Sequence, residues 1–108
     1  MKNDIRRTVL IIDDELAVLN SLKRTLRRNY NIILCQDGFS AIQILHEQEI
    51  QVILADQRMP EMNGITLMSK AMEIQPDATR ILITGYSDIQ AVIDAINEGK
   101  VYHYIHKP

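Results

Sequence analysis

The chain has 108 residues, of which 46% are hydrophobic and 24% are charged, and its formal net charge is −2 at pH 7. A chain of this kind can bury the core of one soluble domain without disulfides, and its small net charge excludes a general attraction to nucleic acid or anionic lipid. Cys35 is the one cysteine and no apolar run approaches the ~20 residues of a membrane span, so a cytoplasmic domain without membrane contact is expected. The basic residues 1–8 lack the apolar segment of a signal peptide.

Short apolar runs alternate along the chain with longer amphipathic segments. The first run, 9–12, precedes leucines at helical spacing from Leu16 to Leu26, and the second run is 32–35. A helical segment follows the turn at Asp37-Gly38, and after the run 52–55 another follows Asn63-Gly64. The run 81–84 precedes isoleucines and valine at helical spacing that end at Gly99, and the last run is 102–105. The pattern predicts five strands that alternate with four helices.

This alternation is typical of right-handed crossovers in an α/β fold, and fully apolar runs are typical of strands covered on both faces of a parallel sheet. We find no linker or internal repeat, so residues 1–108 are interpreted as one domain. The chain ends at Pro108, directly after the fifth predicted strand, and a fifth helix is therefore absent from it. We expect the chain to be the truncated N-terminal part of a longer protein.

Polar residues follow several of the predicted strands. Because the carboxyl ends of parallel strands meet at one edge of a sheet, these residues should converge there. Carboxylates brought together raise one another's pKa values unless a cation neutralises them. Mg²⁺ accepts oxygen ligands in an incomplete cage and can add a phosphate oxygen, while a lysine offers a point charge to the remaining phosphate oxygens. The residues in question are Asp13, Asp14, Asp56, Thr84 and Lys107.

Each of these residues also has a structural explanation. The pair Asp13-Asp14 could cap the first helix, and Thr84 or Ser87 could cap the fourth. Asp56 could be a polar turn residue, and Lys107 a solvated side chain. Four such coincidences at the same end of four strands are less favoured than a single site.

The runs VLIIDDE, VILADQRMPEMNG, RILITGYSD and YHYIHKP resemble the receiver domain of two-component response regulators over essentially the whole chain. The resemblance implies a flavodoxin-like, doubly wound sheet of five parallel strands in the order 2-1-3-4-5. The finer pattern resembles receivers attached to ATP-dependent transcription activators or to HD-type cyclic-dinucleotide phosphodiesterases.

The resemblance also implies roles for individual residues. Asp56 matches the phosphoacceptor, and Asp13 with Asp14 matches the acidic pair that positions Mg²⁺, to which the backbone carbonyl of Arg58 is a further ligand. Three positions complete the implied site and its switch: Thr84 matches the hydroxyl that moves to the phosphoryl group, Lys107 the lysine that pairs with it, and Tyr104 the aromatic that turns inward on activation.

Partners follow from the same resemblance. The donor would be a phosphohistidine on a sensor histidine kinase or phosphotransfer protein, and the domain would act on itself without a separate turnover substrate. The surface of the fourth helix and fifth strand would signal to an output domain or a second copy. Arg58 and Tyr86 lie where side chains modulate loss of the phosphoryl group, while Gly85 between Thr84 and Tyr86 leaves the entrance open for a donor.

Three other functions compete with this interpretation. A pseudo-receiver would keep the fold as a docking module that is not regulated by phosphate. A flavin carrier would need a phosphate loop after the first strand, where Asp13-Asp14-Glu15 would repel the flavin phosphate. A haloacid-dehalogenase-type phosphatase needs a different spacing of two aspartates. His46, His103 and His106 show no ligand clustering and are interpreted as structural or solvated, and Cys35 as a buried thiol.

Overall fold

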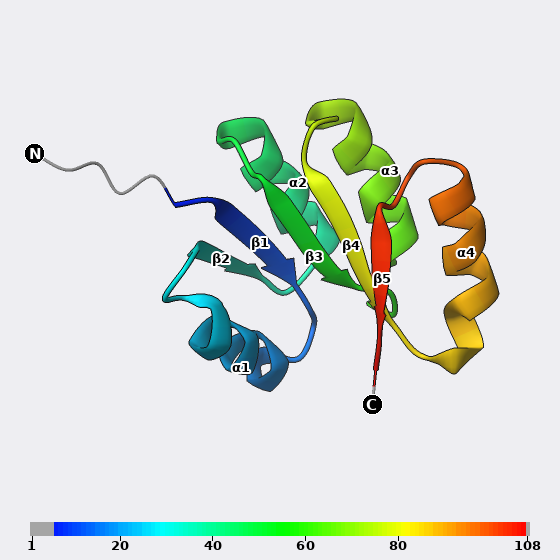
Figure 1. Cartoon of the computed structure of the whole chain (residues 1–108), viewed down its shortest axis with the longest axis horizontal. Helices are drawn as coiled ribbons and strands as arrows, with labels where there is room; N and C mark the ends of the chain where they lie inside the picture. Colours follow the sequence, from blue (N-terminus) through cyan, green and yellow to red (C-terminus); the bar gives the residue numbers. More distant parts are fainter. Residues whose placement is uncertain (1–5, 108) are drawn as a thin grey trace, which may run out of the picture.

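Five parallel strands form one sheet in the spatial order β2-β1-β3-β4-β5, with their carboxyl ends at the same edge (Figure 1). The structure is a computed structural model that describes residues 6–107, and the side chain of Tyr86 lies outside the described part. This topology confirms the predicted fold class, and the described residues contain four α-helices and no fifth. The elements are β1 Thr8–Ile12, α1 Leu16–Leu26, β2 Asn31–Cys35, α2 Gly38–Glu47, β3 Val52–Asp56, α3 Gly64–Ile74, β4 Thr79–Thr84, the 3-10 turn η1 Tyr86–Asp88, α4 Ile89–Asn97 and β5 His103–His106.

The fifth strand was predicted one residue too early. It was expected at 102–105, but β5 is His103–His106 and runs beside β4 from the pair Ile81↔His103 to the pair Thr84↔His106. The prediction counted Tyr102 as an apolar strand residue, whereas Tyr102 is 74% exposed and precedes the first pair with β4, Ile81↔His103. Because β5 ends at His106, Lys107 is the first residue after the last strand.

The fourth strand begins two residues earlier than predicted because a buried arginine opens it. Arg80 donates hydrogen bonds only to backbone carbonyls, those of Lys100 (2.7 Å), Pro76, Ala78 and Gly99 (3.2 Å each). Burial lowers the pKa of the Arg80 guanidinium, and these carbonyls compensate for the water that it has lost. Arg80 thus ties the connection between α4 and β5 to the start of β4.

Alternating side chains of the strands build two apolar cores, one on each face of the sheet. The larger lies under α2, α3 and α4, where Leu10, Ile53 and Leu82 are fully buried. The smaller lies under α1, whose Leu19 packs with Val9, Ile11 and Leu54. Figure 1 shows α1 on one side of the sheet and the other three helices opposite it. Burial on both faces explains why the strand runs are apolar at nearly every position.

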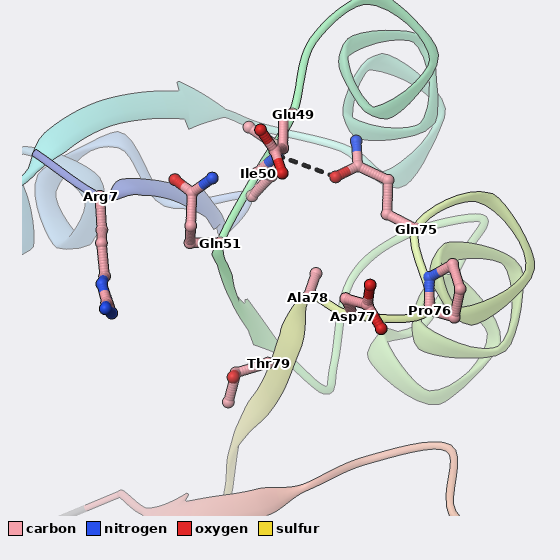
Figure 2. Close-up of a pocket in the computed structure, with 9 residues that line it drawn as sticks. All are labelled: Arg7, Glu49, Ile50, Gln51, Gln75, Pro76, Asp77, Ala78 and Thr79. Atoms are coloured by element: carbon pink, nitrogen blue, oxygen red, sulfur yellow. Dashed lines mark hydrogen bonds between the residues drawn. The ribbon is translucent and has the colours of Figure 1, made fainter. Parts of the chain in front are cut away.

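The amino ends of the strands carry a separate hollow that contains none of the predicted site residues (Figure 2). In it, Gln75 accepts a hydrogen bond from the Ile50 backbone N–H (2.8 Å) and donates to the carbonyls of Leu45 and Gln48 (2.7 Å each). Gln75 therefore joins the end of α3 to the end of α2 and the start of β3. None of the helices in the described part of the chain is long and apolar enough to cross a membrane.

Glycine at position 64 is required by close packing at the other edge. A Cβ there would lie 2.5 Å from Leu82 Cδ2 and 2.8 Å from the backbone oxygen of Asp56. The backbone N–H of Gly64 donates to the carbonyl of Gln57 at 2.9 Å, so α3 begins directly against the end of β3. The residues that follow β3 are thereby held against the sheet.

We predict that Gly64→Ala lowers the free energy of unfolding by about 1–3 kcal/mol, the usual effect of forcing an atom into a packed site. Gly85→Ala is the matched control, because a Cβ at Gly85 would meet no atom within 4 Å. Urea unfolding of both variants followed by circular dichroism measures the difference. Equal stability of Gly64→Ala and the parent would show that the contact at the end of β3 relaxes freely.

Candidate functional site

The register of the sheet brings four of the predicted residues to its carboxyl edge. Asp56 is the last residue of β3 and Thr84 the last of β4, while Asp13 and Lys107 each follow their strand by one residue. Backbone hydrogen bonds extend the ladder past the strand ends, from Asp13 N–H to the Cys35 carbonyl (3.1 Å) and from Lys107 N–H to the Thr84 carbonyl (2.9 Å). The side chains are therefore positioned by rigid backbone rather than by mobile loops.

Asp56 and Lys107 form the central contact of the site. The Lys107 ammonium lies 2.7 Å from Asp56 Oδ1, and the Asp56 side chain is only 4% exposed whereas that of Lys107 is 41% exposed. The contact is an ion pair without a well-aligned hydrogen bond, and no other donor among the described residues reaches the buried Oδ1. The interaction with Asp56 raises the pKa of Lys107, which is therefore charged at neutral pH. Oδ1 thus keeps an available lone pair beside a fixed positive charge.

An acidic cluster adjoins this pair. Asp13, Asp14 and Glu15 offer carboxylate oxygens within 4.8 Å of one another. Asp13 is buried, and this burial raises its pKa, although the Glu15 backbone N–H donates to its Oδ1 at 2.9 Å and favours the charged form. The charges of Asp56 and Asp14 raise the pKa further, and that of Lys107 lowers it. The cluster therefore has more negative charge than the one lysine offsets.

This donor set fits a hard divalent cation. Oxygen ligands from Asp13 and Asp14, with Asp56 beside them, are of the type that Mg²⁺ prefers, and a cation would offset the burial of Asp13. The structural alternative, in which this pair caps the first helix, does not hold, since the N-cap of α1 is Glu15, whose side chain makes no capping hydrogen bond. Glu15 belongs to the acidic cluster and was not among the predicted ligands. The role of the Arg58 carbonyl stays a prediction.

Thr84 and Tyr104 lie on neighbouring strands beside the site. Thr84 is fully buried, and its hydroxyl donates to the Gly85 carbonyl (3.3 Å), whereas the N-cap of α4 is Asp88. The structural alternative, in which Thr84 or Ser87 caps the fourth helix, therefore does not hold. Tyr104 pairs with Leu82 across the strands and is half-buried against the larger core. Its ring is stacked on that of His103, with centroids 5.9 Å apart.

Arg58 spans from the β3–α3 loop to the start of α4. Its Nε donates to Asp88 Oδ2 (2.8 Å), and the same guanidinium donates to Ser87 Oγ (2.9 Å) and to Asp88 Oδ1 (3.4 Å). These contacts raise the pKa of Arg58. Sequence analysis named Arg58 but missed Asp88, which lies 30 positions away and shows no signal other than its place beside a helix start.

Gln57 fixes the loop from which Arg58 projects. Its side-chain oxygen accepts the Ile65 backbone N–H at 2.9 Å, and its backbone N–H donates to the Ile83 carbonyl, also at 2.9 Å. The side chain is buried, so the residue after Asp56 is held by both β4 and α3. Gln57 was not predicted as part of the site, because a glutamine beside an aspartate carries no distinctive pattern.

The histidines and the cysteine agree with the structural or solvated roles that the sequence predicts for them. His46 is exposed on α2, and His103 and His106 are exposed on β5. Cys35 is a buried free thiol at the end of β2, and burial raises its pKa to about 11, which agrees with a structural role. The predicted position of the Tyr86 side chain falls outside the described residues.

The chain is similar to known proteins over nearly its whole length. A family model described as the response regulator receiver domain matches residues 9–108. The hydrogenase transcriptional regulatory protein HoxA of Cupriavidus necator is 37% identical over 106 residues, which are 98% of this chain and 22% of that protein. The chain belongs to the response regulator receiver domain family. It spans about a fifth of the length of the HoxA relatives that it matches.

Solved structures agree with this family. The signal receiver domain of an HD domain-containing protein from Pseudomonas fluorescens Pf-5 is 31% identical with a TM-score of 0.87, over 100% of this chain and 80% of that one. A response regulator protein from Burkholderia pseudomallei, with a phosphorylated aspartic acid, calcium ion and citrate, is 27% identical with a TM-score of 0.85, over 94% of this chain and 60% of that one. The relatives thus include a transcriptional regulator and an HD-domain protein, the two kinds of parent chain that the motifs resemble.

We predict that Asp13→Asn stabilises the cation-free domain at pH 7. Because the folded state raises the pKa of Asp13 above its ordinary value of 3.8, the folded state binds the proton more readily and the charged form costs stability above that range. Removing the charge should raise the free energy of unfolding by on the order of 1 kcal/mol, and the gain should shrink as the pH falls from the raised pKa of Asp13 and disappear below 3.8.

Thermal unfolding in a chelating buffer between about pH 3 and pH 8, a range that includes the ordinary aspartate pKa, measures this difference. Asp77→Asn is the control, because Asp77 is exposed and lies at the opposite, amino edge of the sheet. Adding Mg²⁺ should stabilise the parent more than Asp13→Asn. An Asp13→Asn variant less stable than the parent at neutral pH would contradict the account.

Proposed function

We propose that this domain is the phosphoacceptor of a two-component phosphorelay, and that Asp56 takes a phosphoryl group from a phosphohistidine on a sensor histidine kinase or phosphotransfer protein. The observation that carries the proposal is the state of Asp56 Oδ1. It is buried, without an aligned hydrogen-bond donor among the described residues, and 2.7 Å from the Lys107 ammonium. A carboxylate oxygen held in this way is a nucleophile whose attack an adjacent cation assists.

The reaction is a single transfer. An oxygen of Asp56 forms a bond to phosphorus, the bond from phosphorus to the donor imidazole nitrogen breaks, and its electron pair stays on that nitrogen. Lys107 offsets negative charge on the transferring group, as a positioned cation does in other phosphoryl transfers. The product is a mixed anhydride that water hydrolyses, so the signal expires. The domain modifies itself and has no separate turnover substrate.

Mg²⁺, when bound, would withdraw charge from the phosphoryl oxygens. Asp13, Asp14 and Asp56 are the side chains proposed to hold it, with the Arg58 backbone carbonyl as a further ligand. The acidic cluster, in which Asp13 is buried with a raised pKa, supports this assignment. The Burkholderia pseudomallei structure, in which a calcium ion accompanies a phosphorylated aspartic acid, supports the same combination of groups.

The switch is proposed to run through the β4–β5 side of the site. A new dianion on Asp56 attracts the Thr84 hydroxyl, which in the present structure donates to the neighbouring Gly85 carbonyl. The space left by that movement would accept the Tyr104 ring, which is now half-buried. This rearrangement would change the surface of α4 and β5, through which the domain acts on an output domain or a second copy.

The parent protein is proposed to be a cytoplasmic regulator with this domain as its N-terminal part. An output domain that regulates transcription fits the HoxA relatives, and an HD-type phosphodiesterase output fits the Pseudomonas fluorescens receiver. No direct contact of the receiver with nucleic acid is proposed, since its net charge is −2. The residues after Pro108 in the parent chain would decide between these outputs.

We predict that acetyl phosphate with Mg²⁺ adds one phosphoryl group to the parent domain and none to Asp56→Asn. Intact-mass measurement detects the addition directly. Asp77→Asn is the control, since Asp77 is exposed at the amino edge of the sheet and should be phosphorylated like the parent. A pseudo-receiver predicts no addition to any of the three proteins, and an addition that survives in Asp56→Asn would refute the assignment.

The lifetime of the acyl phosphate is predicted to depend on Arg58 and Tyr86. We expect both side chains to obstruct the path of water to the phosphoryl group, while Gly85 leaves the entrance open to the donor. Arg58→Ala combined with Tyr86→Ala should therefore hydrolyse faster than the parent at matched pH and Mg²⁺. Phosphate release after removal of the donor measures the rates, and equal or slower release in the double variant would refute shielding.

A further inference from the structure

The β3–α3 loop is tied to the start of α4 by the Arg58–Asp88 ion pair. Arg58 and Asp88 line the same small cavity of about 90 Å³ as Asp56, Thr84 and Lys107. The pair therefore stands at the edge of the space in which a phosphoryl group on Asp56 would lie. It also joins the acceptor loop to the element that the proposed switch moves.

The N-cap residue of α4, Asp88, contacts Arg58 and does not cap the helix with its side chain. In α2, Asp37 caps the helix by accepting the Ser40 N–H, and in α3, Asn63 caps it by accepting the Thr66 N–H. Asp88 occupies the same position in α4, but its side chain makes no capping hydrogen bond and its φ of −108° and ψ of 3° are not extended. Its two carboxylate oxygens instead each accept a hydrogen bond from the Arg58 guanidinium.

The two partners are not equally fixed. The Asp88 side chain is 19% exposed, whereas the Arg58 side chain is 70% exposed. An ion pair this exposed is weak and readily exchanged. A phosphoryl group carries close to two negative charges and three acceptor oxygens, so it is a stronger partner for a guanidinium than one carboxylate is.

We propose that Asp88 is a positioning residue that holds Arg58 away from Asp56 before phosphorylation and releases it to the phosphoryl group afterwards. The released carboxylate can then cap α4 by accepting the Ala91 N–H, the counterpart of Ser40 in α2 and Thr66 in α3. Phosphorylation would in this way order the first turn of α4 through an exchange of partners by Arg58. This inference rests on the proposed phosphorylation of Asp56.

Competition between Asp88 and the phosphoryl group for Arg58 predicts the direction in which Asp88→Asn changes the rate of hydrolysis. Asp88→Asn weakens the hold on Arg58, so the guanidinium should spend more time on the acyl phosphate and shield it better. Hydrolysis should therefore slow by about two- to fivefold, the range expected of an exposed ion pair. If Arg58 instead shields the site while bound to Asp88, the same substitution would speed hydrolysis.

The test is a double-mutant cycle on phosphoryl decay. The parent, Asp88→Asn, Arg58→Ala and the double variant are each loaded with acetyl phosphate and Mg²⁺, and phosphate release is followed after the donor is removed. We expect slower decay in Asp88→Asn, faster decay in Arg58→Ala, and no effect of Asp88→Asn when Arg58 is absent. A residue that only stabilised the fold would act equally in both backgrounds.

Asp94→Asn is the matched control, because it removes one negative charge from the exposed face of α4. The Asp94 side chain contacts Gln90 rather than Arg58. Its acyl phosphate should decay at the parent rate. Amide hydrogen exchange at Ala91 gives the second measurement, and phosphorylation should slow it in the parent and not in Arg58→Ala. An equal slowing of exchange on phosphorylation in these two proteins, or decay of Asp88→Asn at the parent rate or faster, would overturn the partner exchange. Failure of the parent to gain a phosphoryl group would instead refute the proposed function.

Discussion

The arrangement of the site depends on the burial of Asp56 next to Lys107. A carboxylate with so little contact with water is costly unless a cation approaches it, and Lys107, the residue after β5, supplies that cation at 2.7 Å. Asp13 adds a second buried carboxylate that the same lysine only partly offsets. The excess of negative charge suits the proposed divalent cation, and Lys107 together with that cation would offset the negative charge of the proposed incoming phosphoryl group.

Packing elsewhere in the domain holds these charges in place. Gly64 lets α3 begin against the end of β3, and Gln57 joins that strand end to both β4 and α3. Arg80 fixes the far end of α4, whereas the near end is held by the weaker and more exposed pair of Arg58 and Asp88. The helix is thus anchored firmly away from the site and loosely beside it, which suits the proposed role of α4 in the switch.

Sequence analysis predicted the alternation of strands and helices because central strands such as β1 and β3 are buried on both faces and the helices on one. The strand order came from the family resemblance, since periodicity alone does not specify which strands are neighbours. Proximity of Asp56 and Lys107 followed from the meeting of strand ends, whereas the start of the fifth strand was misplaced because Tyr102 is apolar in sequence but exposed in the fold. Asp88 and Gln57 were missed because side-chain contacts between distant loops leave no local pattern.

The central claim is that Asp56 is the residue that accepts the phosphoryl group. Borohydride reduces an acyl phosphate of aspartate to the alcohol, which converts that residue to homoserine and marks it permanently. The parent domain, treated with acetyl phosphate and Mg²⁺, reduced and digested, should show homoserine by peptide mass spectrometry at position 56 and at no other aspartate. Homoserine at Asp13 or Asp14, or phosphorylated protein without homoserine at position 56, would contradict the account.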